Sequence, residues 1–307
     1  MAHKPADRIR NVALIGHRGS GKTSLCEALL FEAGVVNRLG RVEDGGTVSD
    51  AEPDEQERQM SIDASVVSFE YSDRKINLID TPGEPSFLAD TVGALRVVDA
   101  AVVVVNAVMG VEVHTERLWS RADAEGLARL VFVNMLDRER ADFFRTLESL
   151  KEAFGSHVVA TEIPIGAEHE VRGVIDLIDM KAFEYGGEGR GSASEVEIPE
   201  DLRAQAEEYR EKLMDEVAEN SDELMERYLE GEEISHEEIV TALKKGVTEG
   251  HLFPVTCGVA TKNLGTNRLL EALVEDVPSP AMRGAIRALD GDGGEIELEP
   301  SEDGDLA

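Results

Sequence analysis

The stretch Gly16–Thr23, GHRGSGKT, decides the fold, and it follows the apolar run Asn11–Ile15. It fits the pattern G-x-x-x-x-G-K-[ST], in which backbone amides and the positive end of a helix hold phosphate groups. The segment after it, KTSLCEALLFEAG, carries apolar residues at helical spacing and ends at Gly34, a residue type that commonly terminates helices. Strand, glycine-rich turn and helix in this order favour a phosphate-binding loop over a chance glycine turn.

Two turns of the chain carry the chemistry expected at phosphate. Lys22 is predicted to reach the β- and γ-phosphate oxygens, and the Thr23 hydroxyl to bind Mg²⁺. Asp80 ends another apolar strand, where its carboxylate can hold the hydration shell of Mg²⁺, and Gly83 can present a bare N–H to a γ-phosphate. Taken alone, residues 80–83 also fit an ordinary Asp-initiated turn. The predicted phosphate-binding residues are Gly16, His17, Arg18, Gly19, Ser20, Gly21, Lys22, Thr23, Ser24, Asp80, Thr81, Pro82 and Gly83.

A third stretch, Val131–Asp137 with the sequence VFVNMLD, ends a strand and addresses the base. It resembles the Asn-Lys-x-Asp guanine reader, with Met135 in the place of the lysine. Asp137 can accept hydrogen bonds from guanine N1–H and the exocyclic amine, which adenine does not present in that arrangement. An unbranched thioether can still pack against the ring face of the base. Asn134, Met135 and Asp137 therefore predict guanine, while a polar strand end and an ATP-using enzyme remain as alternatives.

Alternating strand and helix patterns fill the first half of the chain. Apolar strands are predicted at Ser65–Tyr71, Lys75–Ile79, Ala100–Val105 and Leu130–Val133, and helices over residues 88–97, 112–124 and 142–154. Continuous apolar strands separated by helices are typical of a parallel sheet that is buried on both faces. The sequence therefore predicts an α/β fold of the P-loop NTPase (G-domain) type, with a mostly parallel sheet and helices on both faces.

Two segments interrupt this pattern. Residues 35–62 have no apolar periodicity, and a loop of that length is usually functional or mobile. Residues 157–250 contain two or three short strands, a flexible glycine-rich loop at Gly186–Ser194, and helical sequence. Between Glu195 and Glu249 there are 19 acidic residues against 6 basic ones. The second segment is therefore predicted to be an inserted, acidic α+β subdomain.

The chain then returns to the large sheet. Leu252–Cys257 is an apolar strand, and Thr266–Val277 is a helix stopped by prolines. The predicted GTP-binding domain thus comprises residues 1–156 and 251–280, with residues 157–250 inserted into it. Residues 281–307 carry Asp and Glu among glycines, so we expect a disordered acidic tail or the start of a further domain.

Composition and charge exclude several classes of protein. The formal net charge of −32 repels a nucleic-acid backbone over most of the surface, so any such contact must be local. Cys26 and Cys257 lie far apart in sequence, which favours a reduced, cytosolic protein over a disulfide framework. The apolar run Ala100–Val105 is too short to cross a bilayer, and the N-terminus lacks an apolar signal core. We expect a cytoplasmic monomer that binds neither membrane nor DNA.

Seven segments in order resemble the GTP-binding domain of elongation factor G, from Val12 to about Pro280. They are GHRGSGKTSL, DEQERQMSI, DTPGEPSF, RVVDAAVVVVNAVMGVEVHTERLW, FVNMLDRERADF, IPIGAEHEVRGVIDLIDMKAFEY and PVTCGVATKNLG. The resemblance implies a translation GTPase with GTP and Mg²⁺ as cofactors, and the ribosome, through its RNA and its stalk protein, as partner. Because the chain ends where the family's second domain would begin, we do not expect these residues alone to translocate tRNA.

The resemblance also assigns residues by position. Ser61 stands where the family has the threonine that binds Mg²⁺ and the γ-phosphate, which makes Thr23, Ser61 and Asp80 the implied metal set. Val259 and Ala260 stand where the family has Ser-Ala against the guanine, and Gly19 where it usually has an aspartate.

Glu84 stands where translation GTPases have the histidine that orients the attacking water, so the implied catalytic set is Glu84, Gly83 and Lys22. An ionised carboxylate only accepts hydrogen bonds and adds negative charge beside the γ-phosphate. Three interpretations remain open: Glu84 orients water as a neutral acceptor; turnover is slow or absent and the chain is a regulatory GTP-binding module; or Glu84 points into solvent and caps the following helix.

Overall fold

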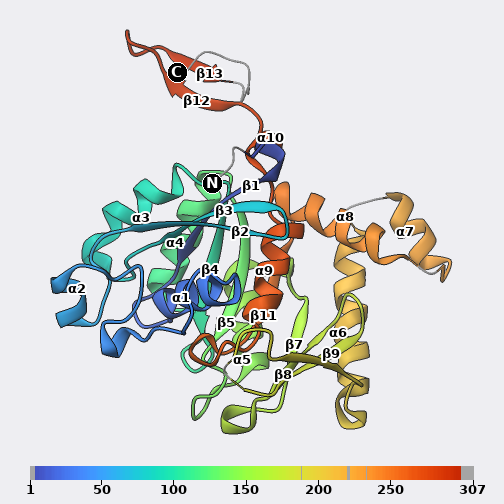
Figure 1. Cartoon of the computed structure of the whole chain (residues 1–307). Helices are drawn as coiled ribbons and strands as arrows, with labels where there is room; N and C mark the ends of the chain where they lie inside the picture. Colours follow the sequence, from blue (N-terminus) through green and yellow to red (C-terminus); the bar gives the residue numbers. More distant parts are fainter. Residues whose placement is uncertain (1–3, 188, 220–221, 233, 299–307) are drawn as a thin grey trace.

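A seven-stranded sheet runs through the centre of the molecule (Figure 1), in the computed structural model that describes residues 4–187, 189–219, 222–232 and 234–298. Its order is β2-β3-β1-β4-β5-β11-β6, and only the β2–β3 pair is antiparallel. The predicted, mostly parallel sheet is therefore confirmed. Its strands are β1 (Ile9–Ile15), β2 (Ser65–Tyr71), β3 (Arg74–Asp80), β4 (Ala100–Asn106), β5 (Ala128–Asn134), β6 (Val158–Ala160) and β11 (Phe253–Cys257).

Helices cover both faces of this sheet. The chain steps from β1 to β3 in one direction and from β3 through β4 to β5 in the other. Right-handed crossovers therefore place α1 on one face and α3 and α4 on the opposite face, and α9 packs beside α1 (Figure 1). These helices are α1 (Lys22–Glu32), α3 (Leu88–Leu95), α4 (Val113–Ala124), α5 (Phe143–Phe154) and α9 (Thr266–Glu275).

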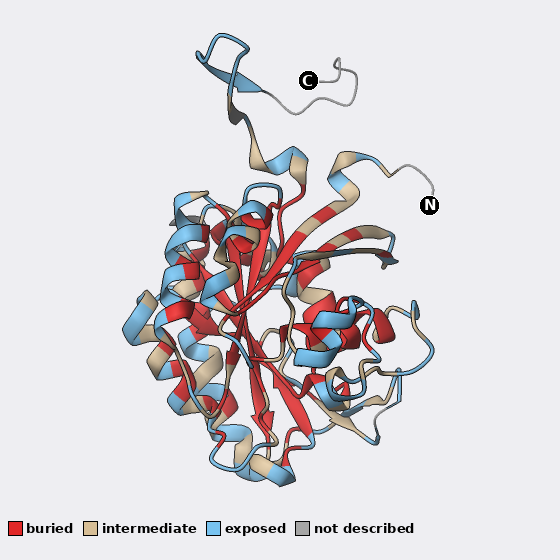
Figure 2. Ribbon diagram, turned by 90° about the vertical axis from the view of Figure 1, so that its left-hand side faces the viewer, coloured by how far each residue is buried: buried red, intermediate tan, exposed pale blue. Residues whose placement is uncertain are grey.

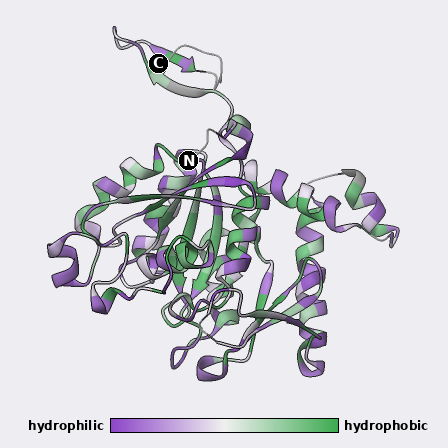
Figure 3. Cartoon of the chain, in the orientation of Figure 1, coloured by the Kyte–Doolittle hydropathy of each residue, from purple (hydrophilic) through white to green (hydrophobic). Residues whose placement is uncertain are grey.

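The sheet is also the hydrophobic core. Every residue of β5 is buried, and so is every residue of β4 except the last, Asn106. The strands of the sheet are accordingly red in Figure 2. Figure 3 shows apolar residues along the strands and hydrophilic residues on the outward sides of the helices. A core covered on both faces holds the carboxyl ends of its strands rigidly. None of the described helices has both the length and the apolar character needed to cross a membrane.

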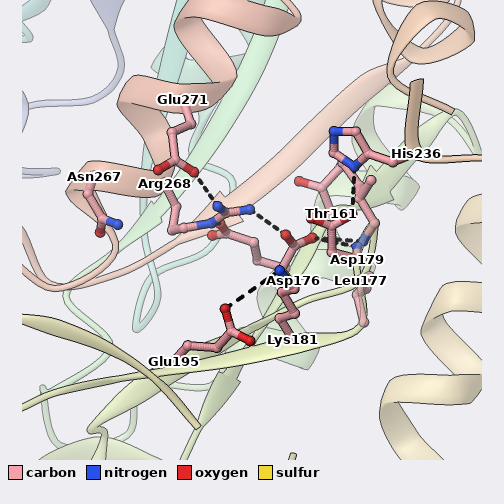
Figure 4. Close-up of polar contacts among 12 residues, drawn as sticks. Thr161, Asp176, Leu177, Asp179, Lys181, Glu195, His236, Asn267, Arg268 and Glu271 are labelled. Carbon is pink, nitrogen blue, oxygen red and sulfur yellow. Dashed lines mark hydrogen bonds and ion pairs between the residues drawn. The ribbon is translucent and has the colours of Figure 1, made fainter. Parts of the chain in front are cut away.

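A four-stranded antiparallel sheet, β10-β9-β8-β7, lies beside the large one. Arg268 of α9 joins the two, because its guanidinium pairs with the buried carboxylates of Glu162 and Asp176; Figure 4 shows the contact with Asp176. Nearby, Asp179 pairs with His236 of α8 (Figure 4). The elements of this region are β7 (Glu162–Ile165), β8 (Gly173–Asp176), β9 (Lys181–Tyr185), β10 (Ala193–Val196), α6 (Glu200–Ala218), α7 (Asp222–Leu229) and α8 (His236–Thr248).

Two strands of this region depart from the sequence expectation. β6 lies within the predicted insertion of residues 157–250, yet it pairs with β11 at the edge of the large sheet. Its three buried residues are too few to show a periodicity in the sequence. β10 begins at Ala193, inside the loop expected at Gly186–Ser194, because it pairs with β9. The rest of the division into domains stays a prediction.

The segment 35–62 is not structureless. It contains the 3-10 turn Val42–Asp44 and the short helix α2 (Pro53–Arg58). The buried Glu55 fixes this helix, because its carboxylate accepts from the backbone N–H groups of Glu52, Ile62 and Asp63. A local capping arrangement of this kind does not require an apolar period, which explains why the pattern missed it.

Residues 286–298 correct the expectation of a disordered tail. They form the antiparallel hairpin of β12 (Ile286–Leu289) and β13 (Glu295–Leu298), which follows the short helix α10 (Pro280–Arg283) and projects from the body (Figure 1). The side chain of Asp290 sets the turn by accepting from the N–H groups of Asp292 and Gly294. Residues 299–307, the rest of that expectation, lie outside the described residues.

Candidate functional site

Loops that follow the carboxyl ends of the strands in the large sheet surround a cavity of about 230 Å³. Because β1, β3, β5 and β11 are parallel, the residues that follow them meet at the carboxyl ends of the strands, where α/β sheets bind ligands. The phosphate loop and the start of α1 contribute Arg18, Gly19, Gly21, Lys22, Thr23 and Ser24 to the cavity lining. Further lining comes from Asp50, Ser61, Gly83, Glu84 and Met135.

Glycines allow the phosphate loop to pass close to its neighbours. Gly16 has φ +149°, and a Cβ there would lie 2.4 Å from the Val104 carbonyl oxygen. Gly21 has φ +90°, and its Cβ would lie 2.3 Å from Asn134 Nδ2. Both positions need glycine for the backbone angle and for space. The loop therefore packs against β4 on one side and against the end of β5 on the other.

Lys22 occupies the floor of the cavity. It is buried, and its Nζ donates to the carbonyl oxygens of Gly16 and His17 at 3.0 and 3.2 Å. Burial lowers the pKa of Lys22 to about 8, while the carboxylates of Asp80 and Asp50 pull it upward. A charged ammonium held in place by its own loop is ready to meet an anion without reorganisation.

Hydroxyl and carboxylate groups gather beside this lysine. Thr23 Oγ1 lies 3.0 Å from Ser61 Oγ, which donates to Asp50 Oδ1 at 2.7 Å. Ser49 Oγ donates to Asp80 Oδ2 at 2.8 Å. Burial raises the pKa of Asp80 to about 6, against the opposing pull of the Lys22 charge. The three predicted metal residues thus lie together, with Asp50 added to them.

The donor set fits a hard divalent cation. Among the described residues, the buried atoms Asp80 Oδ1 and Asp50 Oδ2 have no hydrogen-bond partner. Buried carboxylate oxygens without a partner are costly, and oxygen atoms are the ligands that Mg²⁺ prefers. The residues present therefore fit Mg²⁺, either directly or through its bound water.

Sequence reasoning missed Ser49, Asp50 and Glu27 in this region. The Glu27 carboxylate accepts from the backbone N–H groups of Gly40 and Val48, which fixes the segment 35–62 against α1. The sequence signal was the Ser-Asp pair in a segment that also contains Ser61. That signal is weak because Ser and Asp are ordinary loop residues.

The second turn lies directly on the phosphate loop. A Cβ on Gly83 would be 2.3 Å from Lys22 Nζ and 2.7 Å from the Arg18 backbone nitrogen. Glu84 Oε2 lies 3.2 Å from Arg18 Nη1, and its carboxylate makes no capping bond to the short helix that follows. The interpretation in which Glu84 caps this helix therefore does not hold, since the carboxylate pairs with Arg18 and makes no capping bond.

Three further residues of the predicted phosphate-binding set contact neighbouring elements of the protein. Thr81 Oγ1 donates to the Leu14 carbonyl oxygen at 2.7 Å, and the Pro82 carbonyl oxygen accepts from the Thr91 hydroxyl at 3.0 Å. His17 Nε2 lies 3.2 Å from Glu112 Oε2. The side chains of Thr81 and His17 thus face neighbouring elements, so a phosphate contact from these residues would come from their backbone.

Asn134 joins the phosphate end to the base end. Its Nδ2 donates to the Ser20 carbonyl oxygen at 2.9 Å, and its Oδ1 accepts from the Ala260 N–H at 3.0 Å. The side chain is buried, so these bonds are shielded from water. One amide thereby connects the loops after β1, β5 and β11.

Of the other residues predicted to contact the guanine base, only Met135 lines the cavity. Met135 has φ +63° and lines the cavity, and its Sδ accepts from Asn106 Nδ2. Asp137 lies beyond the described cavity lining and pairs with Lys262 at 2.9 Å. Val259 and Ala260 are buried and do not belong to the cavity lining. Lys262 was missed by sequence reasoning, although a basic residue two positions after Ala260 was the available signal.

Comparisons with known proteins bear on the family and the fold of this chain. The sequence family described as elongation factor Tu GTP binding domain matches residues 7–279. A crystal structure of a protein from Thermus thermophilus is similar to the chain, with a TM-score of 0.85 and 34% sequence identity. The similarity covers 95% of this chain and 45% of that one, so this chain spans less than half of that protein's length.

Proposed function

This chain belongs to the family of elongation factor Tu GTP-binding domains, and from that premise we propose that it is a Mg²⁺-dependent GTP switch of the elongation factor G type with slow intrinsic hydrolysis. It is a GTP-binding domain of the translation-factor type. The observation that carries the proposal is that Lys22, Thr23 and Gly83 line one cavity, with the buried carboxylate of Asp80 close to Lys22 and Thr23. An ammonium, a hydroxyl and a carboxylate close together are the groups that bind a nucleoside triphosphate and its Mg²⁺ in P-loop proteins.

The phosphate end would bind the nucleotide with the loop Gly16–Thr23. Backbone N–H groups at the start of α1 attract anions, and the buried Lys22 adds a full positive charge. Thr23, Ser61, Asp80 and Asp50 are the residues that would hold Mg²⁺. When bound, Mg²⁺ supplies positive charge that offsets the charge developing on the phosphate oxygens. The segment 35–62 supplies Ser61 and Asp50, so its order would depend on the nucleotide state.

The base end supports guanine over adenine. The Asp137 carboxylate pairs with Lys262. Its oxygens can also accept hydrogen bonds from the guanine N1–H and the exocyclic amine. Competition of unlabelled ATP against labelled GTP tests this directly. We expect ATP to compete at least about 100-fold more weakly, because a site built for hydrogen bonds rejects a base that leaves them unpaired. Equal competition would contradict the guanine assignment.

The slow-hydrolysis part of the proposal rests on Glu84. Its carboxylate faces Arg18 on the rim of the cavity, where a water-orienting group would act. An ionised carboxylate, unlike a histidine, cannot donate a hydrogen bond to a phosphate or to RNA. We therefore expect turnover below that of a histidine-containing site by about 100-fold, the usual scale of one proton-transfer or water-positioning group.

Single-turnover GTP cleavage by the wild type and by Glu84→His, each with and without ribosomes, tests this part. We expect slow cleavage by the wild type and a faster rate for Glu84→His, most clearly with ribosomes. Glu84→Gln is the matched control, because it keeps the size of the side chain and removes its charge. Equal rates for all three proteins in every condition would remove the role given to Glu84.

The ribosome is the partner we propose. Co-sedimentation of the chain with ribosomes is expected to be stronger with a non-hydrolysable GTP analogue than with GDP. The acidic helices α6 to α8 would face the stalk protein, and charge-reversed variants of that surface would then lose part of the binding. If nucleotide binds but neither cleavage nor ribosome binding occurs, the chain is a regulatory GTP-binding module instead.

A further inference from the structure

An ion pair joins two residues of the cavity lining, one in the phosphate loop and the other directly after Gly83. Arg18 Nη1 lies 3.2 Å from Glu84 Oε2, and both residues line the cavity. Arg18 is the more exposed partner, with 56% of its side chain accessible against 27% for Glu84. Among the described residues, the guanidinium of Arg18 has no other hydrogen-bond partner. Four of its five N–H groups therefore remain available.

The backbone fixes where this pair stands. The Gly83 Cβ position lies 2.3 Å from Lys22 Nζ and 2.7 Å from the Arg18 nitrogen. The ammonium that is expected to bind the terminal phosphates and the residue that carries the guanidinium thus flank the same turn. The side chains of Arg18 and Glu84 extend from these neighbouring backbone segments and pair with each other.

We infer that Arg18 and Glu84 form one charge-neutral unit that selects a nucleoside triphosphate over a diphosphate. Arg18 holds the Glu84 carboxylate with one nitrogen and offers its remaining N–H groups to the terminal phosphate. An unpaired carboxylate at this place would repel a γ-phosphate, whereas the pair presents a donor-rich face to it. A diphosphate lacks the group that this face contacts. The inference rests on the proposed function, because it concerns the same nucleotide site.

Four proteins test the inference: the wild type, Arg18→Ala, Glu84→Gln and the double variant Arg18→Ala/Glu84→Gln. Affinities are measured for a non-hydrolysable GTP analogue and for GDP, both with Mg²⁺, by titration calorimetry on the full chain. Thermal unfolding of each protein confirms that it is folded. Arg96→Ala is the matched control, since Arg96 is exposed at the end of α3 and its loss changes the net charge equally.

The expected result is a pattern of compensation. Arg18→Ala lowers the affinity for the triphosphate analogue about tenfold, which is the scale of one hydrogen bond to a charged group, and changes the affinity for GDP less than about threefold. Glu84→Gln alone has a small effect. The double variant recovers part of this loss, because it no longer carries the unpaired carboxylate, although it still lacks the donors of Arg18. Arg96→Ala leaves both affinities unchanged.

Two results would overturn the inference. One is an equal loss of both affinities in Arg18→Ala, which would make Arg18 a general phosphate contact. The other is a double variant that binds the triphosphate analogue no better than Arg18→Ala. A wild-type chain that binds neither nucleotide would instead contradict the proposed function, so the two failures are distinguishable.

Discussion

The phosphate end and the base end of the cavity are built by different means. At the phosphate end, positive-φ glycines bring the backbone close to its neighbours, and buried charged groups lie between them. At the base end, the contacts come from side chains: Asn134 bridges two loops, and Asp137 pairs with Lys262. Backbone geometry is insensitive to most substitutions, whereas side-chain contacts change with each one. The G-x-x-x-x-G-K-[ST] pattern of the phosphate loop fixes only the residues that this backbone geometry requires.

The two ends are nevertheless coupled through one residue. Asn134 bonds to Ser20 of the phosphate loop and to Ala260 of the base loop, and it lies against Gly21. A change at this junction should therefore affect both ends, whereas changes elsewhere should affect one. The following experiments test that division.

The largest effect is expected for Lys22→Ala. It removes the buried ammonium, and we expect the affinity for GTP to fall by about 100-fold or more, the combined scale of two hydrogen bonds to a charged group. Titration calorimetry measures the loss. Lys75→Ala is the matched control, because Lys75 lies at the opposite end of β3 and pairs in register with Ile9. A loss of less than tenfold would contradict a dominant role for the phosphate end.

The coupling between the ends is tested by Gly21→Ala. A Cβ would collide with Asn134 Nδ2, so both the loop and the Asn134 bridge must shift. We expect about 30-fold weaker GTP binding, which corresponds to about 2 kcal/mol of strain.

Gly19→Ala is the control for Gly21→Ala. Gly19 has φ +80° but no atom within 4 Å of its Cβ position. It therefore shares the backbone penalty and not the collision. If both variants bind GTP equally well, Asn134 does not couple the two ends.

The base end alone is addressed by Asp137→Asn. Replacing one acceptor oxygen by an amide donor removes a partner for the guanine amine and provides one for a carbonyl at that position. We expect GTP affinity to fall about tenfold, the scale of one charged hydrogen bond, and xanthosine triphosphate to bind more tightly than in the wild type. Competition titrations measure both. An unchanged preference would place the base away from Asp137.

The protonation of Lys22 predicts a pH dependence at the phosphate end. Its pKa is lowered to about 8, and phosphate favours the charged form. Affinity should therefore be constant below that pH and fall as pH rises above it, by up to about tenfold per unit. Calorimetry in buffers of different ionisation enthalpy should show proton uptake on binding at pH 8.5 and less of it at pH 7. Absence of uptake at the higher pH would mean that Lys22 is already fully charged there.

The smallest effect is expected for Met135→Lys. A lysine stem can lie along the base and its ammonium can reach solvent or phosphate, which we expect to raise GTP affinity about threefold. Met135→Ala is the matched variant, and it should lower the affinity by removing the packing surface. Equal affinities for the three proteins would mean that this side chain does not touch the base.

Local sequence patterns determined much of this protein. The loop Gly16–Thr23, the buried strands on either side of it and the helix that follows depend on contacts between residues near in sequence, so periodicity and glycine placement predict them. The large sheet also followed, because continuous apolar strands have no stable place except between covering layers.

Only the tertiary structure decided which distant groups meet. The sequence located Glu84 but not its pairing with Arg18, and it located Asp137 but not Lys262. It also left Asp50 unassigned and placed β6 in the insertion instead of the large sheet. Strand order and register bring these residues together across long stretches of chain, and no local period encodes strand order. The sequence therefore identified several charged residues of the site, such as Lys22, Asp80 and Glu84, but not the residues that pair with them.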